Sequence, residues 1–198
     1  MKKTIWVATQ NSGKIEDFKN LLPQYQIKSL LDLPTPIEIP EDFLTFEENA
    51  LFKAQTLSSI INEPVIADDS GLQIDSLQGF PGVHSARWAD PIKDWKIINE
   101  KLLQKMRENN LVDMSQRQAR FITVIAYYDS KLALQKTFRG EVEGEILPQQ
   151  IGEFGFGYDP IFKPNGQQKS FAQMRLEEKN LYSHRSVACS KLKQFLTN

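Results

Sequence analysis

A polar segment near the start of the chain has the residue types that bind phosphate. Thr9-Gln10-Asn11-Ser12-Gly13-Lys14 lies between a short apolar run and a segment with helical periodicity. The first N–H groups of a helix have no partner within it and favour an anion, and Lys14 adds a compact positive charge. A Walker A loop is excluded, because Ile15 follows Lys14 where that motif needs Ser or Thr. The segment indicates a phosphate-binding loop, with an ordinary polar loop as the alternative.

Two adjacent carboxylates, Asp68 and Asp69, follow the apolar run at 65–67. Adjacent residues of a strand point to opposite faces, so we expect the two side chains to have different roles. One could bind Mg²⁺ or activate water, and the other could cap backbone N–H groups or pair with a basic side chain. We expect the pair at the carboxyl end of a strand, where α/β sheets bind their ligands. Two turn-forming Asp residues before Gly71 are the alternative.

Two segments near the C-terminus could recognise a flat base. Glycines in the segment 154–160 allow close approach of the backbone, and its aromatic rings offer stacking surfaces. Asp159 could accept hydrogen bonds from N–H groups of a base edge. Lys179, His184 and Arg185 supply three donors suited to phosphate or to a purine carbonyl. A glycine-rich turn with core aromatics and a solvated charged segment are the respective alternatives.

The elements that must position these side chains alternate along the chain. Apolar runs predict strands at 4–8, 65–67, 120–128 and 132–140, and helical spacing predicts helices at 14–22, 94–107 and 184–196. Thr45 and Glu48 form a capping-box pattern, which predicts another helix that ends before Pro64. This alternation predicts an α/β fold with a mixed sheet.

Composition excludes several classes of protein. The 198 residues suit a single domain, with a formal net charge of −1 that favours neither nucleic acid nor a membrane surface. The single cysteine, Cys189, rules out an intramolecular disulfide and a zinc site with several thiolate ligands. No apolar run reaches the length of a membrane span, and no secretory signal pattern is present. We therefore expect a cytoplasmic protein without nucleic-acid or membrane partners.

Five motifs together resemble the inosine triphosphate pyrophosphatase family. They occur in that family's order and spacing, and the similarity runs from Met1 nearly to the C-terminus. The motifs are Thr9-x-Asn11-x-x-Lys14, Thr45-Phe46-Glu47-Glu48-Asn49-Ala50, Ala67-Asp68-Asp69-Ser70-Gly71-Leu72, Phe156-Gly157-Tyr158-Asp159-Pro160 and Ser183-His184-Arg185. Five motifs in register are far more specific than any one of them alone.

The resemblance implies an elongated two-lobed α/β fold around a long mixed sheet, with a substrate cleft between the lobes, and a homodimer. It implies one pyrophosphatase domain over residues 1–198 that hydrolyses ITP, dITP and XTP with Mg²⁺ to the monophosphate and pyrophosphate. By motif, Asp69 is the expected general base and metal ligand. The expected substrate contacts are Thr9, Gln10, Asn11, Ser12, Gly13, Lys14, Ser70, Phe156, Gly157, Tyr158, Asp159, Lys179, His184 and Arg185.

One segment departs from the family pattern. The family has Glu-Glu-Thr-Gly shortly before the helix that follows Thr45, and an acid there binds metal. The sequence 40–44 keeps only Glu41 of that pattern, so the second metal acid is Glu41, or Glu38 if the loop is rearranged. Three rival functions stay open: a pyrophosphatase for a modified pyrimidine nucleotide, a nucleotide sensor without turnover, and a nucleic-acid-binding module, which the near-neutral charge disfavours.

Overall fold

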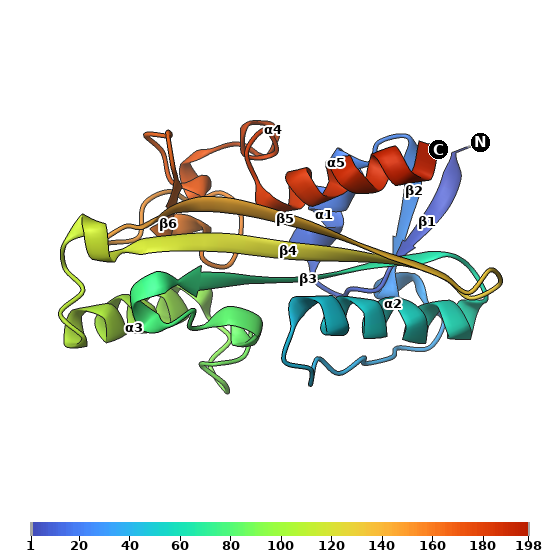
Figure 1. Cartoon of the computed structure of the whole chain (residues 1–198), viewed down its shortest axis with the longest axis horizontal. Coiled ribbons are helices and arrows are strands. Elements are labelled where there is room, and N and C mark those ends of the chain that lie inside the picture. The colour runs from blue at the N-terminus through green and yellow to red at the C-terminus, as the bar shows by residue number, and fades with distance from the viewer. Residues whose placement is uncertain (1, 198) are drawn as a thin grey trace. The chain divides into compact units, whose positions relative to one another are not determined.

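The computed structural model describes residues 2–197, which form a six-stranded sheet with helices packed on it (Figure 1). The strand order is β2-β1-β3-β4-β5-β6. The strands are β1 (Lys3–Val7), β2 (Tyr25–Ser29), β3 (Val65–Ile74), β4 (Gln118–Asp129), β5 (Leu134–Ile146) and β6 (Phe162–Pro164). The helices are α1 (Ser12–Leu21), α2 (Phe46–Ile61), α3 (Trp95–Glu108), α4 (Leu176–Lys179) and α5 (His184–Thr197).

The sheet combines both strand orientations. β1 is parallel to both β2 and β3, whereas β5 and β6 are antiparallel. The predicted α/β fold with a mixed sheet is therefore confirmed. No helix within residues 2–197 is both long enough and apolar enough to cross a membrane.

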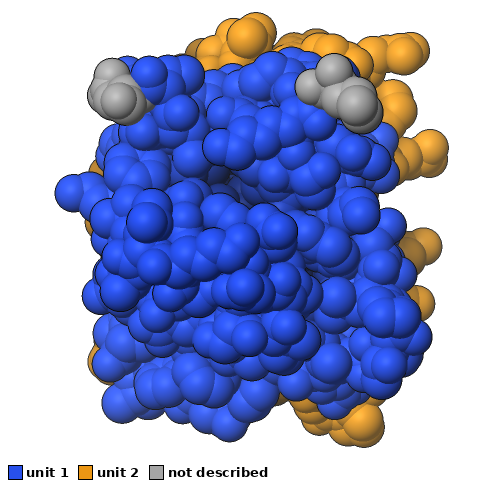
Figure 2. Space-filling view, turned by 90° about the vertical axis from the view of Figure 1, so that its right-hand side faces the viewer, with its two compact units in different colours: residues 1–70, 123–140, 185–198 blue, residues 71–122, 141–184 orange. Residues whose placement is uncertain are grey.

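The chain divides into two compact units, which Figure 2 colours separately. Unit 1 comprises residues 1–70, 123–140 and 185–198, and unit 2 comprises residues 71–122 and 141–184. Each unit has a hydrophobic core of its own.

The core of unit 1 lies between the sheet and two helices. Phe18 of α1 and Leu192 of α5 pack with Val7 of β1, and all three side chains are fully buried. Helix α2 lies on the other side of the sheet (Figure 1), where it buries Ala54 and Leu57. Burial of such apolar side chains stabilises each by roughly 1.5–3 kcal/mol and fixes the helices that carry the polar residues described below.

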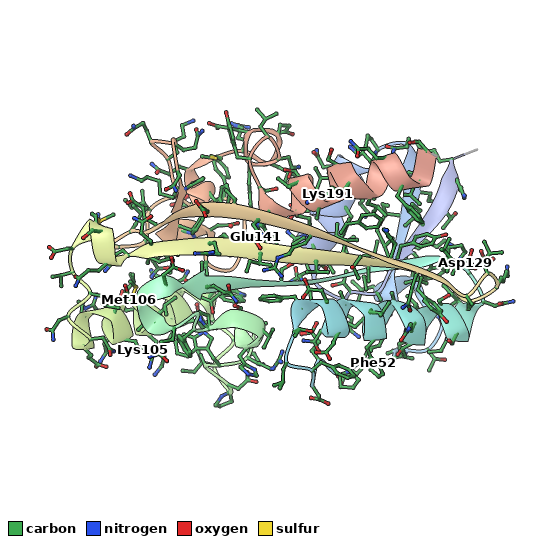
Figure 3. The ribbon with its side chains drawn as sticks, in the orientation of Figure 1. Phe52, Lys105, Met106, Asp129, Glu141 and Lys191 are labelled. Carbon is green, nitrogen blue, oxygen red and sulfur yellow. The ribbon has the colours of Figure 1, made fainter. Side chains whose placement is uncertain are left out.

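The core of unit 2 is built around α3. Leu102 and Met106 are fully buried with Phe162 of β6, as the helical spacing of the sequence predicts. The ammonium group of Lys105 lies over the ring of Phe80, 5.0 Å from its centroid. Figure 3 labels Lys105 and its neighbour Met106 on this helix. Helix α3 thus presents one apolar side to the core and places its charges at the rim.

Two predicted strand boundaries are wrong. The strand expected at 132–140 begins at Leu134 and continues to Ile146. The strand expected at 65–67 continues through both aspartates and Gly71, and ends at Ile74. The segment Asp-Ser-Gly resembles a turn locally, but pairing within the sheet overrides this propensity. By contrast, the cap predicted at Thr45 is confirmed, since its hydroxyl accepts from the N–H of Glu48 at 3.2 Å.

Candidate active site

The predicted phosphate loop lies between β1 and α1. Asn11 caps α1, because its Oδ1 accepts from the N–H of Lys14 at 3.1 Å. The hydroxyl of Thr9 accepts from the N–H of Asn11 at 3.2 Å, and Gln10 donates from Nε2 to the carbonyl of Ile37 at 2.8 Å. These bonds hold the loop against the start of the helix, whose first N–H groups lack intrahelical acceptors. The arrangement suits a bound anion.

Asp68 and Asp69 lie beyond the point where β1 ends. The last paired residues of β1 and β3 are Val7 and Ile66, and β3 then continues without β1 beside it. Both carboxylates are therefore at the carboxyl end of the parallel strand β1, although they are inside β3. The expectation that the two acids end their own strand is therefore wrong, and they lie beyond the end of the neighbouring strand β1 instead.

Asp68 is fully buried and surrounded by cationic groups. Its Oδ2 lies 3.1 Å from Nζ of Lys14 and accepts from Nη2 of Arg185 at 2.9 Å and from the hydroxyl of Ser70 at 2.7 Å. Burial opposes ionisation, but Lys14, Arg185 and Lys53 outweigh it and hold the pKa of Asp68 well below its usual range. This carboxylate stays ionised and serves to pair basic side chains.

Asp69 has different surroundings. It is 3% exposed, and its Oδ2 accepts from Nδ2 of Asn49 at 3.0 Å while its Oδ1 accepts from the N–H of Ser70 at 3.0 Å. Burial raises the pKa of Asp69, Lys53 opposes that rise, and the charge of Glu41 adds to it, so that the pKa lies above its usual value. A carboxylate with a raised pKa is better matched to accepting a proton from water than one held strongly ionised.

Lys53 joins the acids, and sequence reasoning missed it. Its Nζ donates to Oε1 of Glu41 and to the carbonyl of Asp68 at 2.7 Å, and lies 4.0 Å from Oδ1 of Asp69. Burial disfavours its charge, but the three carboxylates Glu41, Asp69 and Asp68 outweigh this and raise the pKa of Lys53. The available signal was a lysine on the buried side of α2, four residues after Asn49.

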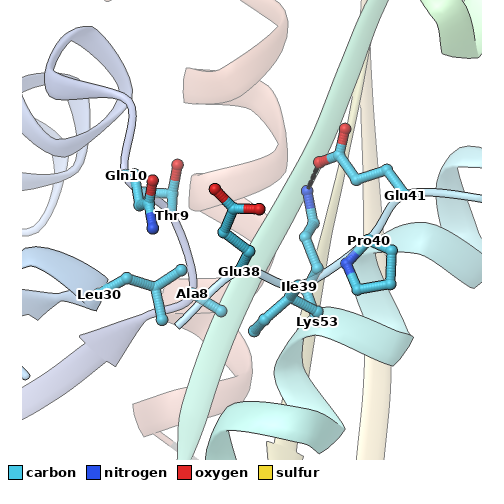
Figure 4. Close-up of a pocket in the computed structure, with 9 residues that line it drawn as sticks. All are labelled: Ala8, Thr9, Gln10, Leu30, Glu38, Ile39, Pro40, Glu41 and Lys53. Atoms are coloured by element: carbon cyan, nitrogen blue, oxygen red, sulfur yellow. Dashed lines mark hydrogen bonds and ion pairs between the residues drawn. The ribbon is translucent and has the colours of Figure 1, made fainter. Parts of the chain in front are cut away.

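A cavity of about 530 Å³ brings the loop and both candidate metal acids together (Figure 4). Thr9 and Gln10 line it on one side, and Glu41 and Lys53 line it on the other. Glu38 also lines this cavity, and Figure 4 shows its carboxylate pointing into the space between Thr9 and Lys53. Glu38 and Glu41, the two acids that the sequence left open as the second metal ligand, therefore both line the cavity. Of these two, Glu41 is paired with Lys53.

The acids fit a magnesium ion that shares its ligands with a substrate. Within residues 2–197, no three His, Cys, Asp or Glu side chains gather as a metal site. Mg²⁺ is usually held by one or two carboxylates, with phosphate oxygens and water completing six ligands. Glu41 and Asp69 both pair with the ammonium of Lys53, so their carboxylates lie on the same cationic group. These two residues could hold Mg²⁺.

The aromatic loop of unit 2 is organised around Asp159. Oδ2 of this buried carboxylate accepts from Nζ of Lys179 at 2.6 Å and from the N–H of Phe156 at 2.8 Å. Gly155 has φ +73°, and a Cβ there would overlap the Asp159 carboxylate. The ammonium of Lys179 also lies over the ring of Phe156, 4.9 Å from its centroid. The sequence predictions at Phe156, Asp159 and Lys179 thus meet in one cluster.

Further contacts within unit 2 hold Tyr158, Gly157 and the ring of His184 in place. The hydroxyl of Tyr158 donates to the carbonyl of Ser85 at 2.6 Å, and burial raises its pKa above the usual value. The carbonyl of Gly157 accepts from Nδ2 of Asn99 at 3.0 Å. The ring of His184 stacks on Phe121, with a centroid separation of 4.7 Å. The loop is therefore held by its own backbone and by buried side chains.

The three predicted donors near the C-terminus are divided between the two units. Lys179 and His184 belong to unit 2, whereas Arg185 begins the last segment of unit 1. The guanidinium of Arg185 donates to Asp17 at 2.6 Å and to Asp68 at 2.9 Å, and is 1% exposed. Its role as a direct substrate contact stays a prediction.

Comparisons with known proteins find relatives that match nearly the whole chain. A family model described as the Ham1 family matches residues 5–195. A dITP/XTP pyrophosphatase of Bacillus subtilis is 43% identical over 198 residues, covering 99% of this chain and 98% of that protein. A dITP/XTP pyrophosphatase of Staphylococcus aureus is 41% identical over 194 residues, covering 98% of this chain and 96% of that protein.

Solved structures of related proteins share the fold of this chain. The Staphylococcus aureus Ham1 protein matches with a TM-score of 0.84 at 40% identity, over 98% of both chains. A HAM1 protein from Coxiella burnetii matches with a TM-score of 0.86 at 35% identity, also over 98% of both chains. The resemblance inferred from the five motifs is confirmed.

Proposed function

This chain belongs to the Ham1 family, and from that premise we propose how its residues cleave a nucleoside triphosphate. It is a nucleoside triphosphate pyrophosphatase that hydrolyses non-standard purine nucleotides and so cleanses the nucleotide pool. We infer that dITP, XTP and ITP are its substrates, and that the products are the monophosphate and pyrophosphate. The homodimer and the cytoplasmic location implied by the sequence are part of this proposal.

The environment of Asp69 carries the chemical part of the proposal. We infer that this carboxylate takes a proton from the water that attacks the α-phosphorus. The bond between the α-phosphorus and the bridging oxygen then breaks, and pyrophosphate leaves with that oxygen. The raised pKa of Asp69 supports this role, because it makes the carboxylate a better proton acceptor. The hydrogen bonds from Asn49 and from the N–H of Ser70 also support it, because they fix the orientation of the carboxylate.

Positive groups of unit 1 would bind the triphosphate. The N-terminus of α1 and the ammonium of Lys14 contact phosphate oxygens, and Lys53 offsets negative charge beside Asp69. Glu41 and Asp69 would hold Mg²⁺, with Glu38 as the alternative acid. When bound, Mg²⁺ supplies positive charge against the phosphates and the leaving pyrophosphate.

We propose that the unit 2 cluster recognises the base, as the family resemblance implies. Phe156 to Asp159 form a backbone and aromatic surface, and Lys179 and His184 supply donors. A donor aimed at the 6-oxo group of hypoxanthine or xanthine would meet the amino group of adenine instead. Leaving such a buried donor without an acceptor costs about 1–3 kcal/mol, which favours inosine over adenosine nucleotides.

The test is pyrophosphate release from ITP, dITP, XTP, GTP, ATP and dUTP, with Mg²⁺ and then with EDTA. We expect release from the first three, loss of release in EDTA, and loss of at least about a hundredfold in kcat for Asp69→Asn. Asp129→Asn is the matched control, because Asp129 is a buried carboxylate of unit 1 that caps the β4–β5 turn. Binding of ITP without any release would favour a nucleotide sensor, and preferred cleavage of dUTP would favour a pyrimidine enzyme.

A further inference from the structure

Asp17 is a buried carboxylate of α1 that the mechanism above does not use. Its Oδ2 accepts from Nη1 of Arg185 at 2.6 Å, and the whole residue is 4% exposed. The other end of the same guanidinium, Nη2, donates to Asp68 at 2.9 Å and to the hydroxyl of Ser70 at 3.1 Å. Arg185 therefore lies between two carboxylates and connects α1 to β3.

The connection continues to the phosphate loop. Oδ2 of Asp68, which Arg185 contacts, is also 3.1 Å from Nζ of Lys14. Lys14 and Asp17 are three residues apart on α1, so their side chains emerge from one side of the helix. The four side chains thus form a closed circuit: Lys14 to Asp68, Asp68 to Arg185, Arg185 to Asp17, and back through one turn of α1.

The four charges of the circuit cancel, and three of its four side chains are buried. It contains two cations and two anions, and the side chains of Asp17, Asp68 and Arg185 are at most 5% exposed, whereas that of Lys14 is 15% exposed. Lys14 is therefore the member through which the circuit reaches solvent. Little water screens these charges, so a change at one member alters the position of the others.

We propose that Asp17 is a positioning residue, which acts through Arg185 and Asp68 to fix where Lys14 presents its ammonium to the substrate phosphates. This inference rests on the proposed function, since it assigns Lys14 to phosphate binding. Without the charge of Asp17, Arg185 keeps one carboxylate instead of two and competes with Lys14 for Oδ2 of Asp68. Lys14 then loses the contact that holds its side chain across the start of α1.

A double-mutant cycle tests the proposal on the full-length protein. The rate of pyrophosphate release from dITP is measured for wild type, Asp17→Asn, Lys14→Gln and the double variant. Lys14 contacts phosphate before and during the reaction, so we expect Asp17→Asn to raise KM on the order of tenfold while kcat changes less. In the Lys14→Gln background, the same change should alter KM by less than about twofold, because the residue it positions is absent.

Equal effects of Asp17→Asn in both backgrounds would overturn the proposal, because they would show that Asp17 acts independently of Lys14. Asp17→Glu keeps the charge and should restore much of the KM. If Asp17→Asn folds poorly, Asp17→Ser, which also removes the charge, replaces it in the cycle. Glu47→Gln is the matched control, since it removes a carboxylate of unit 1 from an exposed ion pair with Arg139 and should leave KM unchanged. Absence of pyrophosphate release by wild type would contradict the proposed function instead.

Discussion

Asp68 and Asp69 are neighbours in the sequence, but their carboxylates are in opposite electrostatic environments. Asp68 has three cationic groups around it that outweigh its burial, whereas at Asp69 burial and the charge of Glu41 together outweigh the ammonium groups of Lys53 and Lys14. Strand alternation predicted separate roles for the pair. It could not predict which residue takes which role, because the cations come from α1, α2 and α5, far away in the sequence.

Substitution of each aspartate should therefore have a different consequence for stability. Asp68→Asn leaves Lys14 and Arg185 with a neutral partner in a buried site, and we expect a loss of about 3–5 kcal/mol in the free energy of unfolding at pH 7. Asp69→Asn removes a charge that burial already disfavours, and it should cost less than about 1 kcal/mol. Urea unfolding of both variants measures the difference, and equal losses would refute the assigned roles.

The lowered pKa of Asp68 also gives a pH dependence of stability. A carboxylate with a depressed folded pKa stabilises the fold above its unfolded pKa of about 3.9, and this contribution is lost as pH falls toward the folded value. Unfolding free energy of the wild type should therefore decline below pH about 4, and Asp68→Asn should decline less steeply. Parallel curves for the two proteins would show that Asp68 does not carry this dependence.

Lys53 should set the acidic limit of activity. Asp69 must be ionised to accept a proton, so activity falls as pH drops through its pKa, which lies above the ordinary aspartate value. Lys53→Met removes a charge that lowers this pKa, and the acid limb of the pH profile of kcat/KM should move to higher pH. Lys169→Met, in an exposed pair with Glu178, is the control and should leave the limb unmoved. A limb that stays in place in Lys53→Met would contradict the coupling.

At the scale of elements, local patterns predicted the helices better than the strands. The cap at Thr45 and the apolar spacing of α3 and α5 define these helices from neighbouring residues alone. The strand β3 extends to Ile74 because it pairs with strands that the local sequence does not contain. The same limit hid Lys53, whose partners lie in the segment before α2 and in β3.

The aromatic loop gives a test at this scale, since two glycines with similar backbone angles have different surroundings. Gly155 and Gly166 have φ +73° and +76°, but a Cβ at Gly155 would overlap Asp159, whereas one at Gly166 meets nothing within 4 Å. Gly166→Ala should cost about 1 kcal/mol for its backbone alone. Gly155→Ala should cost about 1–3 kcal/mol more and raise KM for dITP, because Asp159 is displaced. Equal unfolding free energies of the two variants would argue against this packing.

At the scale of the whole molecule, the sequence predicted the fold class and the family, but it did not predict how the buried charged side chains meet. The α/β fold and the family followed from five motifs, and the model match over residues 5–195 confirms them. The assembly of Lys14, Asp17, Asp68 and Arg185 did not follow, because it joins residues up to 168 positions apart, the separation of Asp17 and Arg185. Such contacts depend on packing that one sequence does not display.

The most direct test of the central claim is hydrolysis of dITP by the wild-type enzyme in water enriched in ¹⁸O. If a water aligned by Asp69 attacks the α-phosphorus, the label enters dIMP and pyrophosphate carries none, and Asp69→Asn abolishes the labelling. Label in pyrophosphate would place the attack on the β-phosphorus and contradict the mechanism, and release of inorganic phosphate with dIDP would contradict the assigned reaction as well.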